Sequence, residues 1–182
     1  MAKLAAKTYG DSLFELALEE NKLDMLMDEA EFVLKVLAEN EDLLKLMTHP
    51  KISKVEKEQI IENIFKSKVS DEMTGFLLIV NKKGRFKEIK GTLEHFIAKV
   101  KEHKKIGVAF VATATDLKQE QKEALVKKLL ETTEYETMEM NYTTDSSLIG
   151  GMVIRIGDRV VDSSIKHKLN DLTRDLLKIQ LA

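Results

Sequence analysis

The stretch from residue 147 to 177 constrains the fold most, because it predicts two strands and a helix in immediate succession. Its first strand is the apolar run from Leu148 to Ile156, whose alternate side chains face opposite sides. Gly157 and Asp158 follow, and a two-residue loop with glycine first is typical of a type II′ turn. The stretch therefore predicts a β-hairpin with two cross-strand pairs, Ile156 with Arg159 and Ile154 with Val161.

Glycines in this hairpin have structural rather than chemical explanations. Gly150 and Gly151 are expected to allow a bulge or a close backbone approach, and Gly157 is expected to adopt a positive φ at the turn. A phosphate-binding loop would need a Lys-Ser or Lys-Thr pair after the glycines, or GxGxxG spacing at the start of a helix. The sequence has neither, so we interpret these glycines as parts of the hairpin.

A helix is predicted directly after the hairpin. Asp162, Ser163 or Ser164 can cap its start. Apolar residues then recur every three or four positions, at Ile165, Leu169, Leu172, Leu176 and Ile179. Charged residues occupy the other side, at Lys166, Lys168, Asp171, Arg174 and Lys178. We expect the apolar face to dock against the hairpin and the charged face to contact water.

The first 105 residues have helical periodicity almost throughout. Residues that end or begin helices divide this region at Asn21, Asn40, Pro50, Ser53, Ser70 and Gly84. Ser53 with Glu56 three residues later is a capping box, and Pro50 marks a sharp connection. Six helices with short connections predict a compact six-helix bundle over residues 1–105.

From residue 106 the pattern becomes mixed. Residues 108–114 and 138–144 are predicted strands, and a helix between them is expected to be capped by Asp116 with Gln119. The predicted fold class is thus mainly α: an N-terminal six-helix bundle followed by a smaller α+β domain with a β-hairpin and a C-terminal helix. The second domain is assigned to residues 106–182.

Composition excludes several classes of function. No cysteine is present, which removes disulfides, thiolate metal sites and a cysteine nucleophile. The 29 basic and 31 acidic residues leave a net charge of −2, so a nucleic-acid partner is not expected. No stretch approaches the roughly 20 apolar residues that span a bilayer, and the N-terminus lacks a secretory or transit pattern. Direct membrane insertion is therefore not expected.

No residue constellation indicates catalysis. The four histidines, His49, His95, His103 and His167, lack the HxxH or HExxH spacing of a metal site. Asp162, Ser163, Ser164 and His167 combine the residue types of a hydrolase triad, but helix capping explains the first three. We predict no catalytic residue, no metal and no cofactor.

The predicted helix over residues 71–83 is unusual because its apolar residues, 76 to 80, cover nearly all of its sides. One explanation is a central helix surrounded by its neighbours. The other is a surface that a partner covers. The sequence alone leaves both open.

Three segments of the chain, Tyr9 to Ala17, Asn81 to Phe86 and Ser147 to Leu177, together resemble one family. It is the delta subunit of bacterial F-type ATP synthases, called the oligomycin sensitivity conferral protein in mitochondria. Small departures from the family pattern occur at Gly10, Asp11 and Ser146.

The resemblance implies a non-catalytic connector between the alpha/beta hexamer and the peripheral stalk, held at the cytoplasmic face of the cell membrane through the complex. It also implies that the first and fifth helices form a groove for the N-terminal helix of an alpha subunit. Mapped here, this groove uses Tyr9, Ser12 and Leu13 with Gly75, Phe76 and Ile79. The C-terminal domain would contact b-type stalk subunits.

Two alternatives from other classes are a small enzyme in the α+β domain and a helical adaptor for RNA or signalling partners. The missing catalytic constellation disfavours the enzyme, and the balanced charge disfavours the adaptor.

Overall fold

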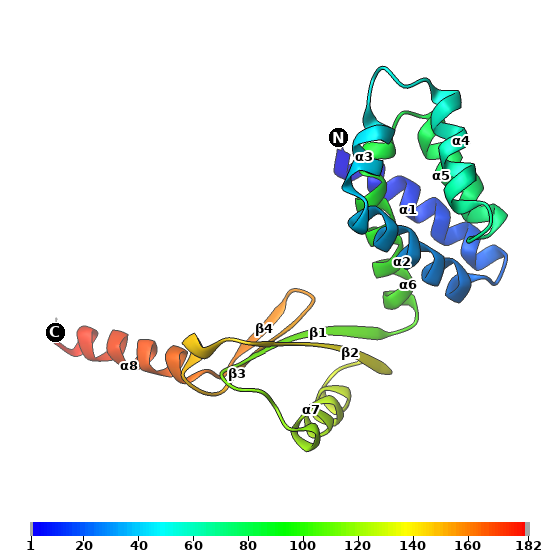
Figure 1. Cartoon of the computed structure of the whole chain (residues 1–182). Helices are drawn as coiled ribbons and strands as arrows, with labels where there is room; N and C mark the ends of the chain where they lie inside the picture. The colour runs from blue at the N-terminus through cyan, green and yellow to red at the C-terminus, as the bar shows by residue number, and fades with distance from the viewer. Residues whose placement is uncertain (1, 181–182) are drawn as a thin grey trace. The chain divides into compact units, whose positions relative to one another are not determined.

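A computed structural model describes residues 2–180 of the chain (Figure 1). These residues form eight α-helices, two short 3₁₀ helices and one four-stranded sheet, so the prediction of a mainly helical chain with a small β component is confirmed. The chain divides into two compact units, Met1–Lys101 and Glu102–Ala182. Each unit is described below by itself.

The first unit is entirely helical. Its elements are α1 (Ala2–Glu19), α2 (Leu23–Glu39), α3 (Glu41–Thr48), α4 (Lys54–Phe65), α5 (Asp71–Lys82), the 3₁₀ helix η1 (Phe86–Glu88) and α6 (Ile89–His103). All six α-helices contribute side chains to one apolar core, in which the largest fully buried side chains are Phe65 and Phe96.

Local sequence signals set the helix ends. Ser53 Oγ accepts a hydrogen bond from the Glu56 backbone N–H, and the Glu56 carboxylate accepts one from the Ser53 N–H. The predicted capping box is therefore confirmed, and hydrogen bonds from the Ser53 N–H and then the Ser53 hydroxyl to the Glu56 carboxylate lower the pKa of Glu56. Gly84, two residues after α5, has φ of +69°, a conformation that ends a helix at low cost.

Close packing of α1 on α6 depends on Gly10 and Asp11. A Cβ on Gly10 would lie 3.0 Å from the Thr92 carbonyl oxygen, so the two helices approach too closely for a side chain there. Asp11 Oδ1 accepts hydrogen bonds from Lys99 Nζ at 2.7 Å and His95 Nε2 at 3.0 Å, which lower the pKa of Asp11. These contacts fix α1 on α6.

The second unit contains β1 (Ile106–Thr113), α7 (Gln119–Thr132), β2 (Thr137–Thr144), the 3₁₀ helix η2 (Ser146–Leu148), β3 (Met152–Ile156), β4 (Arg159–Asp162) and α8 (Ile165–Gln180). The sheet has the order β2-β1-β3-β4. β1 and β2 are parallel and are joined through α7, because parallel neighbours need a crossover. β3 is antiparallel to both β1 and β4.

The register of the β3–β4 hairpin is the predicted one, with Ile156 opposite Arg159 and Ile154 opposite Val161. Gly157 begins the turn with φ of +55°. Before the hairpin, Gly151 has φ of +77°, and a Cβ on it would lie 2.4 Å from the Ser163 carbonyl oxygen. The chain leading into β3 thus passes directly against the chain that leaves β4.

Two predictions about helix starts differ from the structure. Asp116 does not cap α7; its carboxylate accepts a hydrogen bond from Thr144 Oγ1 at 2.7 Å instead. The helix begins later, where the Gln121 side-chain oxygen accepts from the Lys118 N–H. By contrast, α8 begins within the predicted range, since Ser164 Oγ accepts from the His167 N–H at 3.1 Å.

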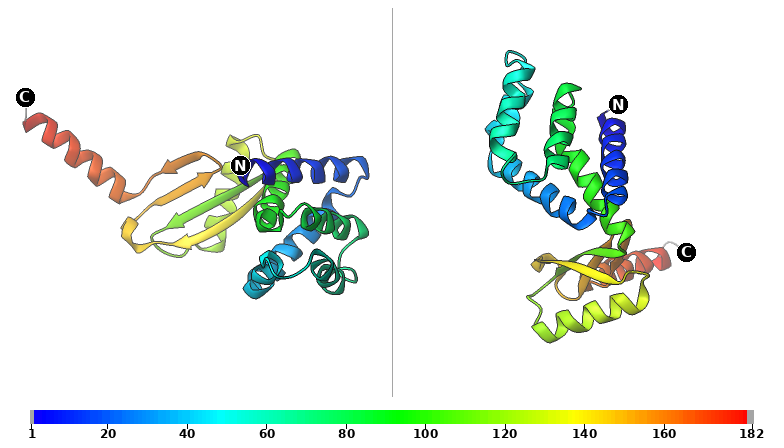
Figure 2. Two further views of the ribbon diagram at one scale, coloured as in Figure 1. Left: turned by 90° about the horizontal axis from the view of Figure 1, so that it is seen from above. Right: turned by 90° about the vertical axis from the view of Figure 1, so that its right-hand side faces the viewer.

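The expected docking of the C-terminal helix against the hairpin is wrong. Within the part of the chain that the structure describes, α8 is anchored at its start: the Ile165 N–H donates to the Gly150 carbonyl, and the Ile165 side chain packs where a Cβ on Gly150 would be. Beyond this point α8 runs away from the sheet (Figures 1 and 2). Along this course the apolar side chains of α8 from Ile165 to Leu176 stay exposed, and the side chain of Ile179 lies outside the described residues.

Candidate partner-binding surfaces

The apolar belt of α5 is divided between the core and the surface. Phe76, Leu77 and Val80 are buried in the core of the first unit, and Leu78 is half-buried against it. Ile79 is 52% exposed. A central position among neighbouring helices therefore explains most of the belt, and Ile79 is the residue that remains for a partner.

Residues mapped to the groove fall into two groups. Leu13 and Phe76 are core residues, 1% and 8% exposed, so they support the surface from beneath. The accessible members are the half-buried Tyr9 and Gly75 and the exposed Ser12 and Ile79. Ser12 Oγ donates to a carbonyl of its own helix and is thus satisfied without a partner.

Gly75 is the member of this set that the fold itself does not explain. It lies in the interior of α5, where glycine costs about 1 kcal/mol relative to alanine. Apart from its chain neighbours and the nearby backbone of its own helix, no heavy atom of the described residues lies within 4 Å of the position that its Cβ would take. Gly75 and Ile79 are four residues apart and so share one helix face. A bare stretch of helix backbone beside an exposed isoleucine can accept a closely packed second helix.

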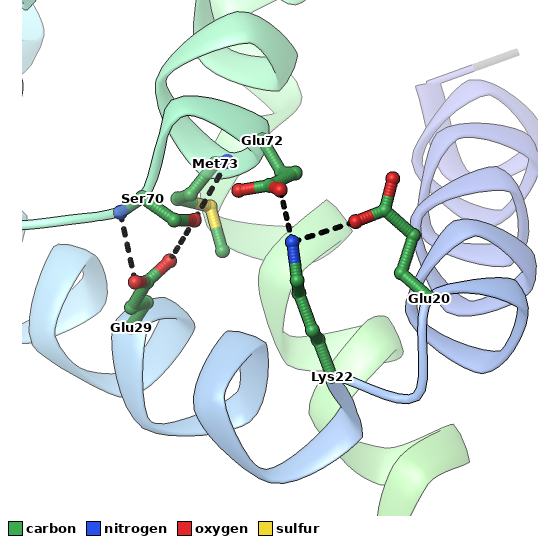
Figure 3. Close-up of polar contacts among 6 residues, drawn as sticks. All are labelled: Glu20, Lys22, Glu29, Ser70, Glu72 and Met73. Carbon is green, nitrogen blue, oxygen red and sulfur yellow. Dashed lines mark hydrogen bonds and ion pairs between the residues drawn. The ribbon is translucent and has the colours of Figure 1, made fainter.

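An ionic bridge links the end of α1 to the start of α5 (Figure 3). Lys22, which follows α1, donates through Nζ to the carboxylate of Glu20 at 2.7 Å and to that of Glu72 in the first turn of α5. The hydrogen bond from Lys22 holds the pKa of Glu72 at about 2. Hydrogen bonds from Lys22 to Glu20 and then Glu72 raise the pKa of Lys22.

A second polar network anchors α5 to α2. The Glu29 carboxylate accepts hydrogen bonds from the Ser70 N–H at 2.8 Å and from Ser70 Oγ at 2.7 Å. Ser70 Oγ accepts in turn from the Met73 N–H and so caps α5 (Figure 3). These contacts hold the N-terminal end of α5 in a fixed position. Sequence reasoning missed both networks, because each joins positions more than 40 residues apart.

The Glu72 pKa gives a stability prediction. Folding lowers it from the ordinary 4.5 to about 2, so its stabilising contribution is fully present above pH 4.5 and disappears as the pH falls towards 2. We expect Glu72→Gln to lower the unfolding free energy at pH 6 and to lose less stability than the wild type between pH 4.5 and 2. Urea unfolding of both proteins across this window measures the difference. Parallel pH curves for the two proteins would contradict the assignment.

The second candidate surface is a groove in the second unit, with a volume of about 1530 Å³. One wall is α7 and the other is the β3–β4 hairpin. Apolar residues from both walls line it, including Leu125, Leu129, Met152, Ile154 and Val161. Basic and acidic side chains also line it, among them Lys128, Arg159, Glu134 and Asp158. α7 packs against β2, where Lys122 Nζ lies 4.9 Å from the centre of the Tyr142 ring.

The apolar face of α8 is the third surface. Ile165, Leu169, Leu172 and Leu176 are between 43% and 63% exposed. The spacing of these residues was evident in the sequence. Their exposure was not evident in the sequence, because it depends on the direction in which α8 leaves the sheet.

Catalytic chemistry finds no support in the described residues. The Asp162 carboxylate accepts from the Ser164 N–H at 2.8 Å, and His167 Nε2 lies 3.1 Å from an Asp171 carboxylate oxygen. The capping prediction is confirmed for Ser164, whose Oγ accepts from the His167 N–H, but not for Ser163, whose Oγ donates to the Met152 carbonyl. His167 Nδ1 lies 3.9 Å from an Asp162 carboxylate oxygen. Among the described side chains, no three His, Cys, Asp or Glu residues are grouped to hold a metal ion. Within residues 2–180, no helix has the length and apolar character to cross a membrane.

Comparison with known proteins gives a consistent family. Residues 5–176 match the family model described as the ATP synthase delta (OSCP) subunit. The chain is 55% identical over 181 residues to ATP synthase subunit delta of Lachnoclostridium phytofermentans, covering 100% of both chains. It is 34% identical to the same subunit of a Geobacillus species, over 96% of this chain and 98% of the relative.

A solved structure has the same fold. A chain of the mitochondrial ATP synthase hexamer of Toxoplasma gondii superimposes with a TM-score of 0.77, covering 94% of this chain and 97% of that chain. The two sequences are only 18% identical, so this match supports the fold.

Proposed function

Since the chain belongs to the ATP synthase delta (OSCP) subunit family, we propose that it joins the catalytic head to the peripheral stalk through two surfaces, one on each unit. It is a non-catalytic subunit of the F-type ATP synthase and a component of its peripheral stalk. Rotation of the central shaft would also turn the alpha/beta hexamer unless the stator held it. The task of this chain is therefore binding that withstands torque.

The first unit acts as a six-helix bundle that holds the N-terminal helix of an alpha subunit against α1 and α5. Gly75 carries this part of the proposal, because its open position on α5 lets a second helix approach the backbone closely. Ile79 supplies apolar contact beside it, and Tyr9 and Ser12 form the opposite side on α1. The bridge through Lys22 links the segment after α1 to the first turn of α5.

The second unit binds the ends of the b-type stalk helices. The groove between α7 and the hairpin and the exposed face of α8 are both apolar and both accessible, which suits an amphipathic helix. We assign residues up to about 105 to the head and the rest to the stalk, and we place the protein at the cytoplasmic face of the cell membrane, held there by its partners.

The decisive experiment fills the open position. In Gly75→Leu, the full chain should fold with an unfolding free energy unchanged or raised by up to about 1 kcal/mol, because leucine favours helix and has space. Binding of a synthetic peptide matching the alpha N-terminal helix, measured by calorimetry, should weaken at least about 30-fold.

A matched pair of variants tests the same surface without added bulk. Ile79→Asp should weaken peptide binding, whereas Val55→Asp on α4, a similarly exposed β-branched residue, should not. A folded Gly75→Leu protein that binds the peptide as well as wild type would remove this surface from consideration.

A further inference from the structure

The exposed face of α8 has the spacing of a coiled-coil seam. Ile165, Leu169, Leu172 and Leu176 follow one another at intervals of four, three and four residues, the alternation of heptad positions d and a. All four are exposed. Leu177 is also exposed but lies outside the seam, at position b. A narrow seam of this kind packs against one other helix rather than against a broad surface.

Charges beside the seam are self-complementary in one orientation. Lys168 and Asp175 occupy the two g positions of α8, and both side chains are exposed. In an antiparallel pair of helices, g positions face g positions. When all four seam residues are matched, Leu169 packs on Leu172 of the second copy, and Lys168 lies across from Asp175 of the second copy. The two-fold axis repeats both contacts.

The parallel orientation lacks this complementarity. There g positions face e positions of the other helix, so Lys168 would lie opposite Thr173. No Lys–Asp pair forms. The charges therefore select the antiparallel arrangement.

We propose that two copies of the free subunit pair through α8 in an antiparallel coiled coil, with Lys168 of each copy beside Asp175 of the other. This goes beyond the proposed function, since it concerns the subunit before assembly. A paired α8 cannot present its seam to the stalk, so self-association and stalk binding exclude each other. With only 16 residues, α8 forms a short contact, and the pairing must be weak.

Analytical ultracentrifugation of the full chain tests the pairing. Between about 10 µM and about 1 mM, the average mass should rise from monomer towards dimer. Leu172→Asp should stay monomeric throughout, because each dimer would then bury two carboxylates in the seam. Leu177→Asp, the matched control on the same helix, should associate like the wild type. A monomer at every concentration, or equal loss in both variants, would overturn the proposal.

Charge exchange tests the orientation. Lys168→Asp should weaken the dimer about 3- to 10-fold, because two exposed ion pairs become repulsive contacts. Combining it with Asp175→Lys should restore wild-type association. A double variant as weak as the single one would exclude the antiparallel register.

The absence of cysteine allows a direct cross-linking test. A mixture of Leu169→Cys and Leu172→Cys proteins should form mainly the mixed disulfide on mild oxidation, whereas parallel pairing would form two homodisulfides. Exclusive homodisulfides would overturn the proposal. All these changes lie on α8, so binding of the alpha peptide should stay normal in each variant. Loss of self-association is thereby distinguished from failure of the proposed head contact.

Discussion

Gly151→Ala should destabilise the second unit by about 2–4 kcal/mol, through left-handed strain and a backbone clash together. Gly151 has φ of +77°, and a Cβ there would lie 2.4 Å from the Ser163 carbonyl oxygen, which is backbone and cannot rotate away. The segment between β4 and α8 must move to relieve the contact. Hydrogen exchange of the β3 and β4 amides, followed by mass spectrometry, should reveal the loss of protection.

Gly157→Ala is the matched control, because Gly157 also has a positive φ, of +55°, but nothing lies within 4 Å of its Cβ position. It should cost only the backbone strain, about 1–2 kcal/mol. If the two variants lost equal stability, the contact with the Ser163 carbonyl would not be the cause. We further expect Gly151→Ala to retain alpha-peptide binding, which we propose for the first unit, while coupling to the stalk, which we propose for the second, fails.

Phe96→Ala should destabilise the first unit by about 3–5 kcal/mol, the largest effect that we expect. Phe96 is on α6, is fully buried and is among the largest side chains in the shared core. Its removal leaves a cavity that six helices would have to collapse to fill. Urea unfolding followed by circular dichroism at 222 nm should show an earlier transition, since most of the helix is in this unit.

The same substitution at Phe110 provides the comparison. Phe110 is on β1, is 46% exposed and lies 5.0 Å from the Arg155 guanidinium. Phe110→Ala should cost at most about 1 kcal/mol, from the lost contact with Arg155 and a little apolar area. Comparable losses at both positions would mean that burial of Phe96 in the shared core is not the cause of its effect.

Local signals in the sequence predicted local structure well. The Ser53–Glu56 capping box and the turn at Gly157 each depend on a few neighbouring residues. Both could therefore be predicted without knowledge of the rest of the fold. The hairpin register followed from the turn. These features, with the change from helical to mixed patterning, were enough to predict a mainly helical chain with a small sheet.

Features that depend on distant contacts could not be predicted. The sequence shows that Leu13 and Phe76 are apolar residues of predicted helices. Only the packing of the helices shows that both side chains lie in the core rather than on the surface. Asp116 was predicted to cap a helix, but its carboxylate accepts a hydrogen bond from Thr144, 28 residues further along the chain. Likewise, the apolar spacing of α8 predicted docking on the hairpin, whereas the helix leaves the sheet after its capped start. Neither the sequence around Lys22 nor the sequence around Glu72 indicated the ion pair between these two side chains.

The connection between the two units has a mechanical consequence. α6 ends at His103 and β1 begins at Ile106, so tension leaving the helices enters the sheet directly through β1. β1 is an inner strand with hydrogen-bonded neighbours on both sides, eight residue pairs with β2 and five with β3. A pull on it is shared between two ladders at once, whereas an edge strand could be peeled off one hydrogen bond at a time. The strand order thus places the entry point of the load at the part of the sheet that is hardest to unzip.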